Sequence, residues 1–244
     1  MKLKGRTIQI FDYVKTILIM PITLVQAIWV KLTVLRLPEP SGKRSGICGE
    51  GKNLRLLIIG DSAAAGVGVN TQLNAISGQL AKELAAKYNV DWQLVASNGS
   101  TSSDIANELS NLTEQKFDYV LISVGVNDVT NLTKTSEWTT NIKNIVKLLS
   151  TNFGAPNIIF SAVPPMHLFN AIPFPLSWWL GKRVNKLNEL MIHTLKAYER
   201  SVVLKFDLPF KPEYLAKDGI HPSKLAYETW AKQVANEISK WDNI

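Results

Sequence analysis

The chain has 244 residues, 46% of them hydrophobic and 19% charged, which suits one α/β domain with a sizeable core and leaves no room for two large domains. Its net charge of +7 arises in residues 1–52, where nine Lys/Arg face three acids, because residues 53–244 hold eighteen Lys/Arg and seventeen acids. A nearly neutral domain argues against nucleic acid as the main partner. The single cysteine, Cys48, excludes an internal disulfide framework and a cysteine-cluster metal site.

An apolar stretch near the N-terminus is suited to contact with lipid. Residues 17–30 are apolar except for Thr23 and Gln26, and the stretch continues to Leu37 with basic residues at both ends. No small-residue cleavage site follows it, so we expect an uncleaved segment, residues 17–37, that associates the chain with a membrane. The stretch is short for a span of about 20 apolar residues, so spanning and lying on the surface both stay open. A helix packed on the domain's own surface is the alternative.

Prolines and glycines between residues 38 and 51 predict a loose linker, with Cys48 as an ordinary member of it. The chain is therefore expected to divide into an N-terminal basic and hydrophobic segment with its linker, residues 1–52, and one domain, residues 53–244.

Five apolar runs alternate with helical patterns through this domain. The runs cover residues 54–59, 92–96, 119–124, 157–163 and 201–206, and the helical patterns lie near 74–88, 102–113, 138–150, 180–199 and 223–240. Near-continuous apolar runs are typical of strands buried on both faces of a parallel sheet. The sequence predicts an α/β fold of three layers, flavodoxin-like, with an about five-stranded parallel sheet and helices on both faces. Ligands bind at the carboxyl ends of such strands.

The first strand is followed by small residues from Gly60 to Gly68 that leave Ser62 at the expected N-terminus of a helix. Backbone N–H groups at a helix start can stabilise a developing oxyanion beside a serine nucleophile. Two other interpretations stay open: Asp61 or Ser62 caps the helix, or the loop cradles a phosphate.

Two further strand ends carry candidate oxyanion donors. Gly99 follows the second strand, where its backbone can approach a ligand, and Asn127 follows the third strand, where its side-chain amide can donate. An ordinary turn is the alternative for each of them.

A carboxylate and an imidazole stand three residues apart just before the last helix. Asp218 can hold His221 through Nδ1–H and leave Nε2 free to accept a proton from a serine hydroxyl. A turn with a solvated histidine is the alternative. Of the other two histidines, His193 falls within a helical pattern, and His167 follows the fourth strand without a carboxylate near it in sequence.

These four motifs, in this order, resemble the four conserved blocks of the SGNH (GDSL-like) hydrolase superfamily over roughly residues 54–240. The resemblance implies that Ser62 is the nucleophile, His221 its base and Asp218 the orienting acid. It implies an oxyanion hole formed by Ser62, Gly99 and Asn127. Ala63 stands where the name-giving leucine would be, a departure that touches subfamily and not chemistry because leucine is not a reacting group.

The likeness extends to the residues Val-Pro-Pro-Met at 163–166 and Asp-Gly-Ile-His-Pro-Ser at 218–223, which resemble a bacterial esterase branch. The resemblance implies cleavage of carboxylic esters, lipid or lysophospholipid esters among them, without a metal or organic cofactor. A carbohydrate O-acetylesterase or an acyltransferase would use the same site. A phosphate-binding module without catalysis would leave Asn127, Asp218 and His221 unexplained.

Four aromatic residues on a proline-rich connection after the fourth strand are candidates for substrate binding: Phe169, Phe174, Trp178 and Trp179. Aromatic side chains commonly line ligand pockets. The alternative is that they cover the core.

Overall fold

The computed structural model describes residues 19–154, 156–205, 209 and 211–242. Its centre is a six-stranded sheet with the strand order β1-β3-β2-β4-β5-β6. The strands are β1 Ser45–Cys48, β2 Lys52–Gly60, β3 Tyr88–Ala96, β4 Tyr119–Ser123, β5 Asn157–Ser161 and β6 Ser201–Leu204. All neighbours pair in parallel except β1, which runs antiparallel to β3. The predicted α/β fold with a parallel sheet is confirmed, with one strand more than expected; residue 206, assigned to the last strand from sequence, lies outside the described residues.

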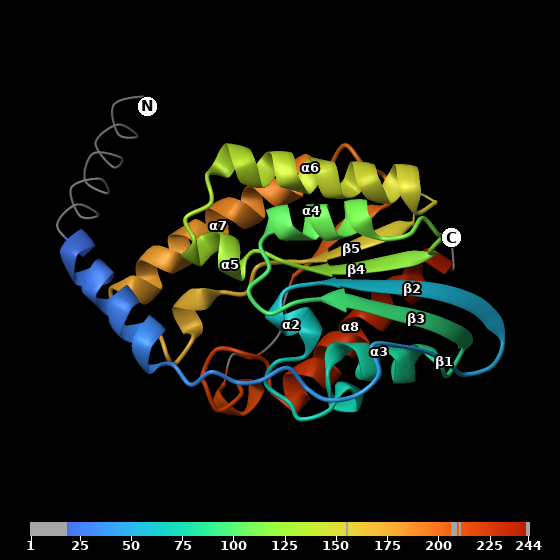
Figure 1. Cartoon of the computed structure of the whole chain (residues 1–244), viewed down its shortest axis with the longest axis horizontal. Helices are drawn as coiled ribbons and strands as arrows, with labels where there is room; N and C mark the ends of the chain where they lie inside the picture. Colours follow the sequence, from blue (N-terminus) through green and yellow to red (C-terminus); the bar gives the residue numbers. More distant parts are fainter. Residues whose placement is uncertain (1–18, 155, 206–208, 210, 243–244) are drawn as a thin grey trace.

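Helices cover both faces of the sheet (Figure 1). One face carries α2 Ser62–Ala65, α3 Ile76–Leu84 and α8 Lys224–Asp242; the other carries α4 Ser102–Asn111, α5 Val126–Thr130, α6 Thr135–Asn152 and α7 Leu176–Leu195. Short 3₁₀ turns lie at η1 Gln72–Asn74, η2 Met166–Leu168 and η3 Pro212–Tyr214. In β2, Leu57 and Ile59 pack on one face while Leu56 and Ile58 pack on the other. Both faces of this central strand are therefore core, which is why its sequence is a near-continuous apolar run, interrupted by Arg55.

The helices pack on the sheet through apolar stripes of helical period. In α6, Trp138, Ile142, Ile145 and Leu149 are fully buried at spacings of three and four residues. Full burial of one such side chain contributes about 1.5–3 kcal/mol. The Trp138 indole N–H also donates to the Leu187 carbonyl at 3.1 Å and so ties α6 to α7.

The linker predicted up to residue 52 is wrong for residues 45–48, which form the edge strand β1. Gly46 pairs with Trp92, and β1 covers the otherwise open edge of β3. A strand of four residues that contains a glycine has no apolar run for a sequence pattern to detect. The sheet thus begins before residue 53, where the domain was expected to start.

Residues 19–33 form a helix, called here the N-terminal helix, that lies beside the start of α7 (Figure 1). Residues 17 and 18 of the predicted lipid-contacting segment lie outside the described residues. The Gln26 side chain fixes the helix, because its amide donates to the Phe174 carbonyl at 2.8 Å and accepts from the Leu176 N–H at 3.0 Å. Within the described ranges, no helix combines the length and apolar character needed to cross a membrane.

Candidate active site

The turn between β2 and α2 presents Ser62 at the carboxyl edge of the sheet. Gly60 makes the turn feasible, because a Cβ at this position would come within 2.2 Å of the Ser123 carbonyl oxygen on β4. Asp61 then caps α2 by accepting a hydrogen bond from the Ala63 N–H at 3.1 Å. The capping that was an alternative for this motif therefore falls to Asp61, and Ser62 occupies the first helical position.

Ser62, His221 and Asp218 form a continuous hydrogen-bonded relay. His221 Nε2 lies 2.9 Å from Ser62 Oγ, and His221 Nδ1 lies 2.5 Å from Asp218 Oδ2. The loop before α8 brings His221 to a serine that is 159 residues away in the chain. With Nδ1 held by a carboxylate, Nε2 is the nitrogen that can take the proton of the serine hydroxyl.

Asp218 is held in its ionised form by donors on its own turn. Its side chain is fully buried, and its Oδ1 accepts from the N–H groups of Ile220 and His221 at 3.0 Å each. Burial by itself raises the pKa of this carboxyl, but the hydrogen bonds and the nearby imidazole outweigh it and lower the pKa below the ordinary value. A charged, fixed carboxylate is what an orienting acid requires.

Gly99 and Asn127 flank the same edge of the sheet. Gly99 has a φ of +91° and open space where a side chain would project, so its backbone is accessible to a ligand. In the part of the chain that the structure describes, the N–H groups of Gly99 and Ser62 have no hydrogen-bond acceptor. Asn127 Nδ2 donates to the Ser100 carbonyl at 2.9 Å and so links the loop after β4 to the loop that carries Gly99. Two free backbone donors and a side-chain amide are thus present at the edge of the sheet that carries the serine.

Asp128, next to Asn127, is an anchoring residue that the sequence pattern did not single out. Its carboxylate is almost completely buried and accepts from Ser102 Oγ at 2.6 Å and from the Ser102 N–H at 3.0 Å. Burial raises the pKa of Asp128 against these hydrogen bonds. The contact fastens the start of α5 to the start of α4, and thereby fixes Asn127 relative to the Gly99 loop. An acid in the short segment after β4, next to Asn127, was the only signal available in the sequence.

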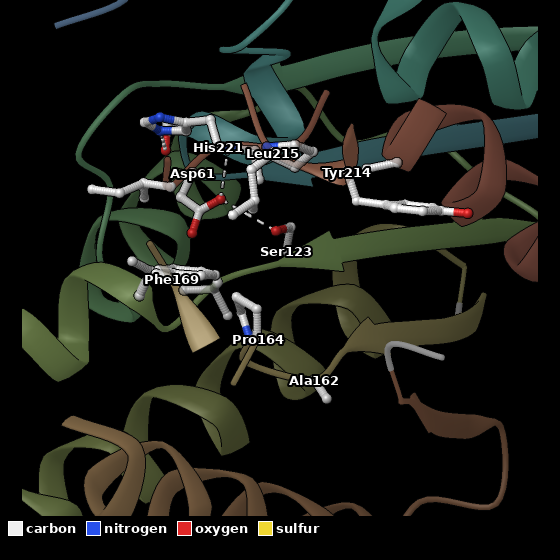
Figure 2. A pocket seen from close by; sticks show the side chains of 15 residues that line it. Asp61, Ser123, Ala162, Pro164, Phe169, Tyr214, Leu215 and His221 are labelled. Atoms are coloured by element: carbon white, nitrogen blue, oxygen red, sulfur yellow. Dashed lines mark hydrogen bonds between the residues drawn. The ribbon is translucent and has the colours of Figure 1, made fainter. Parts of the chain in front are cut away.

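An apolar pocket opens beside Ser62 (Figure 2). Its lining side chains come from the strand ends, the loop after β5 and the segment that leads to α8: Val124, Val126, Ala162, Pro164, Phe169, Leu215, Ile220 and Pro222. Asp61 and Ser123 are polar members of the lining, and Figure 2 shows the two side chains joined by the 3.2 Å hydrogen bond from Ser123 Oγ to Asp61 Oδ1. Burial raises the pKa of Asp61 to about 6, although donors from Ala63 and Ser123 oppose the shift.

The four aromatic residues predicted to bind substrate do not gather in this pocket. Phe169 lines it and is buried. Phe174 is 75% exposed at the start of α7. Trp178 and Trp179 lie on α7, where Lys182 Nζ stands 4.2 Å from the Trp178 ring centre and the Arg183 guanidinium stands 5.9 Å from that of Trp179. A role of the last three in substrate binding stays a prediction.

The other two histidines lie apart from the relay. His167 sits in η2, with its ring against Gly181 of α7, and His193 is exposed on α7. Over residues 19–154, 156–205, 209 and 211–242, no group of three or more His, Cys, Asp or Glu side chains is arranged to hold a metal ion.

The fold and this relay define a serine hydrolase of the SGNH kind. Residues 58–229 match the GDSL-like Lipase/Acylhydrolase family, and the chain belongs to that family. It is similar to an arylesterase from Vibrio mimicus, with 26% identity over an alignment of 194 residues that covers 76% of this chain and 88% of the relative. These relationships identify the protein as an ester hydrolase.

Solved structures share the fold. A psychrotrophic esterase EstA from Pseudoalteromonas sp. superposes with a TM-score of 0.61 at 20% identity, over 78% of this chain and 99% of the other. An acetylxylan esterase from Geobacillus stearothermophilus superposes with a TM-score of 0.59 at 17% identity, over 78% and 95%. The predicted SGNH hydrolase fold is therefore confirmed.

Proposed function

We propose that the chain hydrolyses carboxylic esters through an acyl-enzyme formed on Ser62. The observation that carries the proposal is the relay from Ser62 Oγ through His221 to Asp218, with distances of 2.9 and 2.5 Å. It stands at the carboxyl ends of parallel strands, where α/β proteins bind their ligands.

In the first half of the reaction, Ser62 Oγ attacks the ester carbonyl carbon while its proton passes to His221 Nε2. The carbonyl oxygen becomes an oxyanion, which accepts hydrogen bonds from the N–H groups of Ser62 and Gly99 and from the Asn127 amide. Asp218 stabilises the imidazolium that forms. The tetrahedral intermediate then collapses, and the alcohol leaves with the proton from His221.

In the second half, water replaces the alcohol. His221 Nε2 takes a proton from the water as the oxygen attacks the acyl carbon, and the same donors hold the second oxyanion. Collapse releases the carboxylic acid and returns the proton to Ser62 Oγ. Every proton is carried by groups of the chain or by water.

The apolar pocket beside Ser62 is proposed as the site of the acyl group. Its lining is hydrocarbon apart from Asp61, Ser123, Tyr214 and the catalytic side chains, which suits an acyl chain better than a sugar or a charged group. Phe169 and Ile220 contribute apolar surface. This favours carboxylic esters with a hydrocarbon acyl group, lipid esters among them.

The test compares p-nitrophenyl esters of graded acyl length on the wild type, on Ser62→Ala and on Ala162→Phe. Ser62→Ala is expected to lose activity by about 10⁴-fold or more. Ala162→Phe fills the pocket and is expected to shift the preferred ester toward acetate without loss of acetate turnover. Equal hydrolysis by wild type and Ser62→Ala would overturn the assignment of the nucleophile, and an unchanged length profile in Ala162→Phe would remove the pocket from acyl binding. Transfer of the acyl group to an added alcohol, read by product analysis, would identify an acyltransferase.

We propose further that the N-terminal helix brings the protein to a membrane surface. Its outward face carries apolar side chains that are each more than half exposed: Met20, Ile22, Leu24, Val25, Ile28, Trp29 and Leu32. Leu35, just after the helix, is also more than half exposed. Exposed Lys31 and Arg36 accompany this face, and the first 52 residues carry almost all of the net positive charge. An apolar face bordered by cations suits the interface of an anionic bilayer.

Sedimentation with vesicles of phosphatidylcholine and phosphatidylglycerol tests this contact. Trp29→Glu is expected to weaken vesicle binding by about tenfold or more, because it removes an aromatic anchor and adds an unfavourable charge. Leu73→Glu is the matched control, since Leu73 is 77% exposed on η1 away from the helix. Equal binding by wild type and Trp29→Glu would contradict the proposal. A dimer that dissociates in Trp29→Glu would instead assign the face to a second copy of the chain.

A further inference from the structure

The residues that follow the N-terminal helix reach the loop that carries Gly99. Glu39 Oε1 accepts a hydrogen bond from the Asn98 N–H at 2.9 Å, although the two residues are 59 positions apart. The other carboxylate oxygen of Glu39, Oε2, lies 2.9 Å from Arg44 Nη1. We call residues 19–44, the N-terminal helix and the residues that follow it, the N-terminal extension. One carboxylate therefore joins this extension to Asn98, the residue directly before Gly99.

Arg44 ties the same loop at its base. Its second guanidinium nitrogen donates to the Ala96 carbonyl, the last residue of β3, and its own carbonyl accepts from the Leu94 N–H at 2.7 Å. The planar guanidinium thus bridges Glu39 and the end of β3, a geometry that a lysine ammonium does not reproduce. Glu108 also interacts electrostatically with Arg44.

The loop of residues 97–100 is consequently fixed on both sides of Gly99. The Ser97 N–H donates to the Gly60 carbonyl at 3.2 Å, and the Ser100 carbonyl accepts from Asn127 at 2.9 Å. Asn98 is held by Glu39 alone among these contacts, and the Gly99 N–H stays free to donate. At a glycine with a φ of +91°, small changes in the preceding peptide redirect this N–H.

We infer that Glu39 and Arg44 are positioning residues for ester hydrolysis, which hold the Asn98 peptide so that the Gly99 N–H points at the oxyanion. The inference rests on the proposed function, in which Gly99 is an oxyanion donor. A donor acts on the transition state only if it is aimed before the reaction begins. The N-terminal extension is therefore part of the catalytic apparatus, although none of its residues contacts Ser62.

Steady-state kinetics on a short soluble ester test the inference in the full-length protein. Glu39→Ala is expected to lower kcat by about tenfold with little change in KM, because a charge-assisted hydrogen bond to the loop is lost. Glu39→Gln retains a carbonyl oxygen for the Asn98 N–H and is expected to recover most of kcat. Arg44→Lys keeps the charge but loses the bridge, so its kcat is expected to fall between those of Glu39→Ala and the wild type.

Asp91→Ala is the matched control. Asp91 lies on β3, the strand that leads into the loop of residues 97–100, and forms an exposed ion pair at 3.5 Å with Arg55 on β2. Its substitution removes this pair without a contact to residues 97–100 and is expected to leave kcat unchanged. A second measurement is the ratio of turnover of an ester to that of its thionoester, whose sulfur uses oxyanion donors poorly. This ratio is expected to fall in Glu39→Ala and to stay constant in Asp91→Ala.

Three results would overturn the inference: wild-type kcat in Glu39→Ala, a loss confined to KM, or an equal loss in Asp91→Ala. If a variant unfolds, circular dichroism reveals it, and the folded Glu39→Gln and Arg44→Lys proteins decide the outcome. Ser62→Ala, measured alongside, separates the two levels of the proposal. If Ser62→Ala is inactive and Glu39→Ala is fully active, only the positioning role fails; if Ser62→Ala is active, the proposed mechanism fails with it.

Discussion

The relay at the carboxyl ends of the strands and the N-terminal extension, residues 19–44, are built by different means. Asp218 and His221 lie three residues apart on one turn, and the parallel sheet carries that turn to Ser62. The extension instead attaches through isolated contacts over long stretches of chain: Gln26 reaches Phe174, and Glu39 reaches Asn98. The catalytic side chains thus lie in short local motifs that the regular sheet brings together, whereas the contacts of the extension follow no regular pattern. The relay is expected to be far more sensitive to substitution.

The largest effect is expected from Asp218→Asn. The amide leaves the shape of the turn intact but no longer stabilises the imidazolium or selects the tautomer with a free Nε2, so kcat should fall by about 10⁴-fold. Stopped-flow or steady-state assays of p-nitrophenyl acetate hydrolysis measure kcat, and far-ultraviolet circular dichroism is the control for folding. A kcat within tenfold of the wild type would mean that Asp218 is not the orienting acid.

A smaller loss is expected from Asn127→Ala. Removal of one oxyanion donor lowers kcat by about 10²–10³-fold, whereas KM should change little. Because Asn127 also holds the Ser100 carbonyl, the substitution should loosen the Gly99 loop as well. The double variant with Glu39→Ala sharpens the comparison between the two regions. If both residues act on the same loop, the combined loss is smaller than the product of the single losses. Strictly multiplicative losses would mean that Glu39 and Asn127 act independently.

Asp61→Asn is expected to change the pH dependence of stability. Its raised pKa of about 6, against an ordinary value near 3.9, means that the folded state favours the protonated carboxyl. The corresponding stabilisation is complete below pH ~4 and is lost as the pH rises through about 6, a change of about 3 kcal/mol in the free energy of unfolding. Urea unfolding of both proteins from pH 4 to 7 measures it. Wild-type stability should fall relative to that of Asp61→Asn over this range, and parallel curves would contradict the burial of a charge at Asp61.

The smallest effect is expected from Gln26→Ala in the extension. Loss of its two hydrogen bonds to the backbone near Phe174 should cost about 1 kcal/mol or less locally, because the side chain is only partly buried. Hydrogen exchange of residues 19–33 should quicken, while kcat on a soluble ester stays at the wild-type value. A fall in kcat comparable to that of Glu39→Ala would show that the whole extension, and not only its Glu39–Arg44 pair, supports the oxyanion loop.

Most of the fold could be predicted from the sequence because buried parallel strands leave a strong pattern. The run at 54–59 and the stripe of Trp138, Ile142 and Leu149 identify a strand and a helix without further information. The edge strand β1 was missed for the converse reason. Its pairing with β3 satisfies backbone groups, and backbone hydrogen bonds leave no mark on the choice of side chains.

The sequence by itself identified the residues of the relay and placed them at the carboxyl edge of the sheet. Parallel strands end at one edge of the sheet, so motifs that follow successive strands must converge, and Ser62, Gly99, Asn127 and His221 could be grouped before any coordinates. Only the tertiary structure decided which neighbours line and hold the site: Phe169 rather than Phe174 in the pocket, Asp128 against Ser102, and Glu39 against Asn98. Such contacts join side chains to distant backbone or to single polar groups. They have neither period nor fixed spacing, and packing alone creates them.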